Sequence, residues 1–232
     1  MQTGDMPWHG GSISENFDAM FLRSADYSRH EVSLAHVARG MSLEDPSCYC
    51  GVIVTGSPAM VTDREKWSEK SALWLRQAVL KRVPVLAVCY GHQLLAHALG
   101  GTVGPLPGGM ELGTHQVTLE PLAQKHPLLQ EMPQRFSANM AHSQTVLKAP
   151  KGAVVLGRSA HDAHQILAYG RHVLSLQFHP EFDAAAMHAC VCMELDRLAL
   201  LPEFRAPHLG LPVQETPEAR GILGAFVRAC RQ

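Results

Sequence analysis

Short apolar runs alternate with longer segments of helical spacing in the first half of the chain. The segment GVIVTGSP (51–58) contains β-branched apolar residues that end at a glycine and a proline, which predicts a buried strand followed by a turn. Residues 63–82 have an Asp at the start, early acidic residues, late basic residues and a helical apolar spacing, which predicts a surface helix. VPVLAVC (83–89) predicts a second buried strand, and GHQLLAHAL (91–99), followed by two glycines, predicts a second helix. This order of elements is typical of a parallel sheet.

The second half of the chain has a different pattern. Short strand candidates separated by turn signals predict antiparallel strands or hairpins appended to the sheet. These candidates are THQVTLE (114–120), AVVLGRS (153–159), HQILAY (164–169) and HVLSLQF (172–178). Residues 183–200 and 215–231 predict helices, and the segment 201–213 between them is irregular. We therefore expect an α/β fold of three layers, in which a mostly parallel open sheet is flanked by helices, and a single domain over residues 1–232.

Composition narrows the classes of partner. The formal net charge is −1, and acidic and basic residues are interspersed, so we expect no nucleic acid and no membrane partner. The apolar runs are far shorter than the ~20 residues that a bilayer requires. The opening MQTGDMPWHGG lacks the basic start and apolar stretch of a secretory signal, so we expect a cytoplasmic protein with reduced cysteines. A small molecule or a protein is the expected partner.

Two pairs of cysteines have C-x-C spacing, Cys48 with Cys50 and Cys190 with Cys192. One interpretation is a shared metal site, and the other is small buried apolar residues. We favour the second, because structural zinc sites typically use C-x-x-C spacing.

His161 and His164 form an H-x-x-H pair, but no third ligand is near them in the sequence, so we expect a structural role. No G-x-x-x-x-G-K-[ST] loop is present, so we predict no nucleotide hydrolysis. We expect no metal and no other cofactor.

Cys89 lies at the corner between the strand and the helix predicted over 83–99. A strand that turns sharply into a helix presents its first turn residue at the carboxyl edge of the sheet, where α/β folds hold ligands. Ala87 and Gly91 supply the small residues that such a strained turn needs, and the helix N-terminus favours a thiolate. The pattern indicates a nucleophile, and a buried core cysteine is the alternative.

The segment LSLQFHPEF (174–182) offers a base for that nucleophile. His179 follows an apolar strand and is restrained by Pro180, and Glu181 lies two positions further on. A carboxylate there can orient the imidazole and stabilise its charged form. Cysteine, histidine and glutamate together make a triad.

Five segments in this order resemble the class I glutamine amidotransferases, the triad-type family. They are VTGSP, PVLAVCYGHQLLAHALGG, LGTHQVTL, MAHSQTV and LQFHPEF, within about residues 51–182. The chain is most similar to stand-alone members that resemble the amidotransferase domain of GMP synthase. The resemblance implies a flavodoxin-like sheet, with residues 183–232 as a helical extension. It also implies that Cys89 is the nucleophile, His179 the general base and acid, and Glu181 the residue that orients His179.

The resemblance further implies where the substrate is held. The oxyanion would be bound by the backbone N–H groups of Ser57, which follows Gly56, and of Tyr90. Family members often have a second glycine where Ser57 stands, so the chain departs slightly there. Gln93, one helical turn after Cys89, would contact the amino-acid end of the substrate.

The segment MAHSQTV (140–146) resembles the family segment whose main chain holds the substrate's α-amino and α-carboxylate groups. The residues concerned are Ser143 and Gln144, through their backbone, with His142 supporting the loop.

Three functions are compatible with these residues. The first is hydrolysis of the glutamine side-chain amide through a γ-glutamyl thioester, either for a separate synthase that accepts the ammonia or as a free-standing glutaminase. The second is hydrolysis of γ-glutamyl amides or peptides by the same triad, which a wider pocket beside Cys89 would favour. The third is a non-catalytic regulator, against which the complete triad argues. The sequence does not identify the ammonia acceptor or the oligomeric state.

The beginning of the chain departs from the family pattern. An apolar strand normally comes first, yet this chain opens at MQTGD. Either the start lies upstream or the sheet has a truncated first strand. A missing strand would leave neighbouring edges unpaired, so we expect at least a vestigial strand or a covering partner, and a first helix near Asn16.

Overall fold

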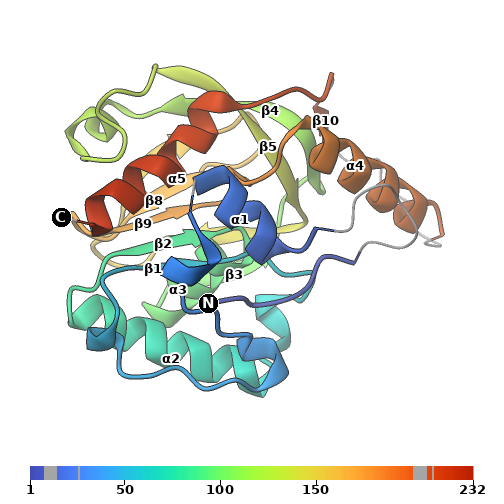
Figure 1. The fold of residues 1–232 in the computed structure, drawn as a ribbon. Coiled ribbons are helices and arrows are strands. Elements are labelled where there is room, and N and C mark those ends of the chain that lie inside the picture. The colour runs from blue at the N-terminus through green and yellow to red at the C-terminus, as the bar shows by residue number, and fades with distance from the viewer. Residues whose placement is uncertain (8–14, 26, 201–207, 211, 232) are drawn as a thin grey trace.

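The computed structural model describes residues 1–7, 15–25, 27–200, 208–210 and 212–231 (Figure 1). Within them an eight-stranded sheet has the order β1-β2-β9-β8-β7-β4-β10, with β5 also paired to β4, and β3 and β6 form a separate two-stranded antiparallel sheet. The strands are β1 (Val52–Val54), β2 (Val85–Val88), β3 (Thr102–Pro105), β4 (Glu111–Leu119), β5 (Arg135–His142), β6 (Gln144–Lys148), β7 (Val154–Arg158), β8 (Ile166–Ala168), β9 (Val173–Leu176) and β10 (His208–Gly210). The α-helices are α1 (Phe17–Ala25), α2 (Lys66–Leu80), α3 (Tyr90–Ala98), α4 (Ala184–Ala199) and α5 (Pro217–Cys230).

This α/β fold with flanking helices and appended antiparallel strands confirms the expected fold class. The parallel pairs are β1 with β2, β2 with β9, and β4 with β10. The strands of the second half otherwise pair antiparallel, so the antiparallel part of the sheet is larger than the sequence indicated. The connections 159–165 and 169–172, which join β7 to β8 and β8 to β9, are short, and an antiparallel neighbour is the one that a short turn can reach. β4 and β5 are joined by the longer segment 120–134.

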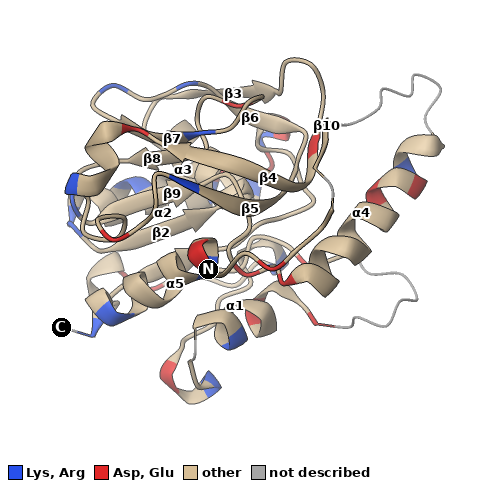
Figure 2. Cartoon of the chain, turned by 90° about the horizontal axis from the view of Figure 1, so that it is seen from above, with Lys and Arg blue, Asp and Glu red and all other residues tan. Residues whose placement is uncertain are grey.

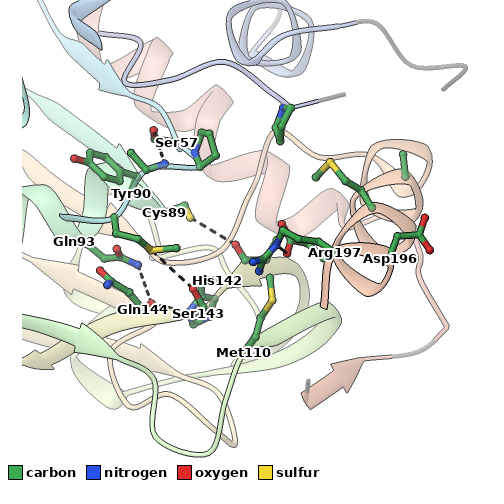
Figure 3. Close-up of a pocket in the computed structure, with 18 of the residues that line it drawn as sticks. Ser57, Cys89, Tyr90, Gln93, Met110, His142, Ser143, Gln144, Asp196 and Arg197 are labelled. Atoms are coloured by element: carbon green, nitrogen blue, oxygen red, sulfur yellow. Dashed lines mark hydrogen bonds and ion pairs between the residues drawn. The ribbon is translucent and has the colours of Figure 1, made fainter. Parts of the chain in front are cut away.

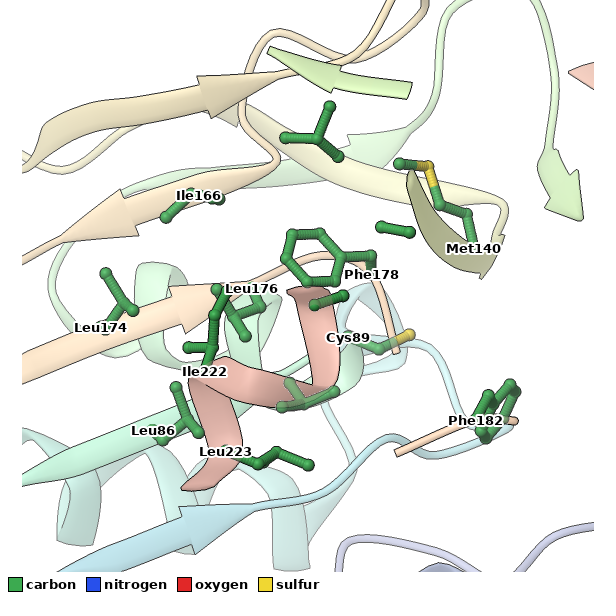
Figure 4. Packing of buried hydrophobic residues seen from close by; sticks show 14 of the residues in the cluster. Leu86, Cys89, Met140, Ile166, Leu174, Leu176, Phe178, Phe182, Ile222 and Leu223 are labelled. Atoms are coloured by element: carbon green, nitrogen blue, oxygen red, sulfur yellow. The ribbon is translucent and has the colours of Figure 1, made fainter. Parts of the chain in front are cut away.

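The side chains of β2 point alternately to the two faces of the sheet, and the hydrophobic core is accordingly divided into two layers. Leu86 and Val88 pack with α1 and α5 on one face, whereas Val85 and Ala87 pack with α2 and α3 on the other. All four side chains are fully buried, as expected for a strand covered on both faces. Figure 4 shows the first layer, in which Ile222 of α5 lies among the leucines of the central strands.

The N-terminal residues form the expected vestigial strand. The amino group of Met1 donates to the Ile53 oxygen at 2.9 Å, and the Thr55 N–H donates to the Met1 oxygen at 3.1 Å. On the other side, Gln2 forms a parallel bridge with His36. The edge of β1 is therefore paired over this short stretch. The expected first helix is also confirmed, since α1 begins at Phe17, whose N–H donates to Asn16 Oδ1 at 2.8 Å.

The other helices agree with the sequence patterns to within a few residues. The segment expected to be irregular, 201–213, contains β10 at 208–210, so that expectation was wrong there, and residues 201–207 and 211 lie outside the described residues. Acidic and basic residues are dispersed over the helices and loops (Figure 2). None of the helices in the described ranges combines the length and apolar character needed to cross a bilayer.

Candidate functional site

A sharp turn joins β2 to α3 at Cys89, as the sequence predicted. Cys89 has φ 51° and ψ −105°, in the region that residues other than glycine rarely adopt. Its N–H donates to the Leu176 oxygen of the neighbouring β9 at 2.8 Å, which holds the turn against the sheet. A Cβ on Gly91 would lie 2.8 Å from the Val54 oxygen, so the turn requires glycine there. This geometry places the thiol at the start of α3 and at the carboxyl edge of the sheet.

His179 and Glu181 lie directly after β9, beside the turn. His179 Nδ1 is 2.7 Å from Glu181 Oε1, and the two side chains are 4% and 0% exposed. The ring stacks on Phe182, and a Cβ on Gly56 would lie 2.9 Å from His179 Cε1, so a side chain at position 56 would collide with the ring. With Nδ1 engaged by the carboxylate, Nε2 is the nitrogen left for the thiol.

The charge state of His179 follows from its neighbours. Burial acts to lower the pKa of its imidazole, but Cys89 and Glu181, through charge and hydrogen bonds, outweigh burial and raise the pKa to about 10. A protonated imidazole beside Cys89 can give its proton to a leaving group next to the sulfur. The arrangement can therefore supply a nucleophile and a proton donor together.

A cavity of about 730 Å³ opens beside Cys89 (Figure 3). Seven of the residues singled out in the sequence line it: Ser57, Cys89, Tyr90, Gln93, His142, Ser143 and Gln144. Gly56, His179 and Glu181 are not among the residues that line it, and the side chains of His179 and Glu181 are buried.

Two residues that line the cavity with Cys89 have backbone N–H groups without a partner in the described ranges. Across the described residues, no hydrogen bond uses the N–H of Ser57 or of Tyr90. Tyr90 is the first residue of α3, where an N–H has no partner within the helix. The Ser57 hydroxyl accepts from the Ala59 N–H at 3.2 Å, so its side chain stabilises the local turn.

Gln93 contacts the segment 142–144 as well as the cavity. Its Nε2 donates to the Gln144 oxygen at 2.8 Å and to Gln177 Oε1 at 3.0 Å. Ser143 accepts through its main-chain oxygen from the Leu106 N–H at 2.9 Å. The amide of Gln93 is thus used to hold the segment that the sequence assigned to substrate binding.

Sequence reasoning missed two contributors to the site. The first is α4, which contributes Ala189, Cys192, Met193, Glu194, Asp196 and Arg197 to the cavity wall. The segment was predicted as a helix, but no motif in it indicated a contact with the site.

The second missed contributor is Glu111, a fully buried carboxyl at the start of β4 that lies 2.9 Å from His142 Nε2. The available signal was an acidic residue a few positions before the strand candidate 114–120. Within the described part of the chain, Glu111, His142 and Asp162 alone bring three metal-ligating atoms within 4.8 Å of one another. These atoms are engaged in hydrogen bonds with each other and with neighbouring side chains, so we treat them as a hydrogen-bonded network.

His161 and His164 do not belong to that group. The ring of His161 stacks on His208 of β10 with centroids 3.8 Å apart, and the His164 N–H donates to Asp162 Oδ1.

The interpretation of both cysteine pairs as small buried residues was wrong for Cys48, Cys50 and Cys192, which are exposed, and right for Cys190. Two positions along a helix are about 200° apart, so a C-x-C pair on α4 cannot face the core with both side chains.

Comparison with known families identifies the fold and its site region. Residues 16–191 match the family model described as glutamine amidotransferase class-I. The chain belongs to this family. The match spans the turn at Cys89 and the segment with His179 and Glu181.

Curated relatives that match this chain carry the names of three different activities. A glutamine-hydrolysing GMP synthase of Thermomicrobium roseum is 38% identical over 131 residues, which are 56% of this chain and 23% of that protein. Gamma-glutamyl peptidase 5 of Arabidopsis thaliana is 28% identical over 142 residues, 60% of this chain and 57% of that protein. The putative glutamine amidotransferase YLR126C of Saccharomyces cerevisiae is 31% identical over 156 residues, which are 66% of this chain and 61% of that protein. The chain spans less than two thirds of the length of each.

Solved structures share the fold of this class-I amidotransferase. A glutamine amidotransferase of Thermotoga maritima superposes with a TM-score of 0.72 at 22% identity, over 93% of this chain and 92% of that one. A glutamine amidotransferase of Methylobacillus flagellatus superposes with a TM-score of 0.74 at 22% identity, over 98% of this chain and 92% of that one.

Proposed function

We propose that this chain hydrolyses a γ-glutamyl amide bond through a thioester on Cys89, with the glutamine side chain as the simplest substrate. The observation that carries the proposal is a thiol on a strained turn, open to a cavity, with the buried His179–Glu181 pair beside it. Membership of the class-I family and the raised pKa of His179 support it.

The proposed steps balance with the groups present. The Cys89 thiolate attacks the carboxamide carbon, and the oxyanion accepts hydrogen bonds from the N–H groups of Ser57 and Tyr90. The C–N bond breaks as protonated His179 gives its proton to the departing ammonia or amine. Water then attacks the thioester and loses a proton to His179, and the C–S bond breaks to release glutamate and the thiolate. Glu181 keeps the ring oriented throughout.

The substrate's α-amino and α-carboxylate groups are proposed to bind the main chain of Ser143 and Gln144. Gln93 and His142 both hydrogen-bond the Gln144 oxygen, which supports a fixed shape for this segment. A rigid pocket wall is what positions a small substrate for attack.

A second candidate is a hydrolase of γ-glutamyl amides or peptides with larger leaving groups. The size of the cavity favours it, because about 730 Å³ is room for a drug-sized ligand and far more than glutamine fills. The Arabidopsis relative is named as a gamma-glutamyl peptidase, which agrees with this candidate.

In the amidotransferase form of the proposal, a separate synthase accepts the ammonia. The Thermomicrobium roseum relative is a glutamine-hydrolysing GMP synthase of which this chain matches 23%. We place the reaction in the cytoplasm, where thiols stay reduced, because the six cysteines are all unpaired.

The test is a panel assay that measures release of ammonia or amine from glutamine and from several γ-glutamyl amides and dipeptides, with and without cell extract. Cys89→Ala is the blank, and Cys192→Ala is the matched control, since Cys192 is another thiol in the same cavity wall. We expect turnover that Cys89→Ala abolishes and Cys192→Ala retains. Turnover of dipeptides with inert glutamine would select the second candidate, and full turnover by Cys89→Ala would overturn both.

A further inference from the structure

One face of α4 forms the wall of the cavity opposite the thiol. Met193, Arg197 and Leu200 line the cavity and follow one another at spacings of four and three positions, so they share a face of the helix. In Figure 3 the Arg197 side chain extends from α4 into the cavity, toward the side on which Cys89 lies, whereas Asp196 points away. A guanidinium group therefore lies across the cavity from the candidate nucleophile.

The guanidinium of Arg197 is oriented by one partner and keeps most of its donors free. Its Nε donates to Glu194 Oε2 at 2.8 Å, which fixes the plane of the group. In the described part of the chain, no hydrogen bond or ion pair uses its Nη1 or Nη2. These two nitrogens carry the remaining N–H donors, in the fork that matches the two oxygens of a carboxylate. Among the described residues that line the cavity, Arg197 is the only arginine or lysine.

The departing amine is the part of the substrate that reaches this wall. In the proposed reaction the γ-glutamyl group lies between Cys89 and the main chain of Ser143 and Gln144. The cavity of about 730 Å³ has room for a substrate far larger than glutamine. An amine longer than ammonia therefore extends from the thiol toward α4, and its far end comes within reach of Arg197.

We propose that Arg197 selects γ-glutamyl substrates whose departing amine carries a carboxylate, as in γ-glutamyl amino acids, by binding that carboxylate through Nη1 and Nη2. The inference rests on the proposed function and, within it, favours the second candidate. Arg197 determines specificity and takes no part in breaking the bond. Because its side chain is 52% exposed, solvent screens its charge and the expected preference is moderate.

The test compares three γ-glutamyl amides of similar length. γ-Glutamylglycine ends in a carboxylate, γ-glutamylglycinamide in a neutral amide, and γ-glutamyl-ethylenediamine in an ammonium group. The value of kcat/KM is measured for each with the wild type, with Arg197→Gln and with Arg76→Gln, which changes an exposed arginine of α2 outside the cavity wall.

We expect the wild type to prefer the carboxylate to the neutral amide about 5- to 10-fold. Arg197→Gln should lose this preference while its kcat/KM for the neutral amide changes less than about twofold, because only the contact with the carboxylate is removed. Arg76→Gln should keep the preference. A carboxylate preference that survives in Arg197→Gln would overturn the inference, as would a wild type with none.

An amine that bears an ammonium group is the competing class, because Glu194 and Asp196 also belong to the cavity wall. Arg197→Glu should reverse the order, so that the ammonium substrate is hydrolysed faster than the carboxylate substrate. A wild type that already prefers the ammonium substrate would assign the wall to cations and refute the inference.

The failure of the inference and that of the proposed function give different results. Hydrolysis of all three amides with the same ratios in wild type and Arg197→Gln would contradict the inference and leave the function intact. If none is hydrolysed, the function fails, and calorimetry of γ-glutamylglycine and γ-glutamylglycinamide binding to Cys89→Ala, with and without Arg197→Gln, decides the inference alone. A carboxylate preference that disappears with Arg197→Gln supports it, whereas equal affinities or no detectable binding overturn it.

Discussion

His92 makes the stability of this protein sensitive to acid. The side chain is fully buried on α3, where Nδ1 is 2.7 Å from Ser175 Oγ. In the described part of the chain, Nε2 is buried without a hydrogen-bond partner. Protonation would therefore place a charge in a fully buried position with no opposite charge to compensate for it. Burial, followed by the charges of His164 and His142, lowers the pKa of His92 to about 3.

The size of the effect follows from linkage. In the unfolded chain His92 takes up a proton near pH 6.5, whereas in the folded chain it does so only at about pH 3. Because the unfolded state binds the proton more readily, the contribution of His92 to stability is present above pH 6.5 and is lost as pH falls below it. One pKa unit corresponds to about 1.4 kcal/mol, so about 2 kcal/mol of unfolding free energy should disappear between about pH 7.5 and about pH 5. His179 acts in the opposite sense, because its pKa is raised to about 10 and its contribution is lost as pH rises.

The assay is urea unfolding at both pH values for the wild type, His92→Asn and His172→Asn. Asn keeps a polar atom near the position of Nδ1, and His172 is an exposed control. We expect wild type and His172→Asn to lose about 2 kcal/mol more than His92→Asn on acidification, while contributions from other groups cancel in the difference. Equal losses in wild type and His92→Asn would refute the reasoning, since His92 would then titrate alike in the folded and unfolded chains.

Two further predictions concern the turn and the ion pair at the candidate site. Gly91→Ala should lower the unfolding free energy by roughly 1–3 kcal/mol, because the new Cβ would lie 2.8 Å from the Val54 oxygen. As a control, Gly221→Ala on α5 adds a Cβ with no atom within 4 Å, so it should raise the unfolding free energy by about 0.5–1 kcal/mol. Urea unfolding decides this, and destabilisation by both substitutions would contradict it. Glu181→Gln should lower the pKa of His179 and slow alkylation of Cys89 by iodoacetamide at neutral pH, because burial is then opposed by Cys89 alone. Mass spectrometry gives the rate, and an unchanged rate would show that Glu181 does not support the thiolate.

The parts of the site that sequence could predict are those encoded over a few neighbouring positions. Cys89 was found because a strand, a tight turn and a helix follow one another there, and His179 and Glu181 are two positions apart. Contacts set by tertiary packing could not be found this way. Glu111 meets His142 across 31 positions because β4 and β5 pair in that register, and no local pattern fixes a register between two strands.

The same distinction applies to the cavity and to the cysteine pairs. The helical pattern of α4 fixes which residues share a face, but the face that lines the cavity depends on how the helix packs. Neighbouring cysteines on that helix differ in exposure for this reason. The vestigial first strand was foreseen because unpaired backbone at a sheet edge is costly wherever it occurs.

If the proposed reaction holds, the position of α4 separates the groups that cleave the bond from those that select the substrate. Cys89, His179 and Glu181 follow the central strands β2 and β9, whereas Asp196 and Arg197 lie on helix α4 across the cavity from Cys89 (Figure 3). In the proposed reaction, exchanging the residues of that helix that line the cavity would alter the room for the departing amine without touching the groups proposed to break the bond. A library confined to this one face is thus a direct way to redirect the proposed activity toward new amines.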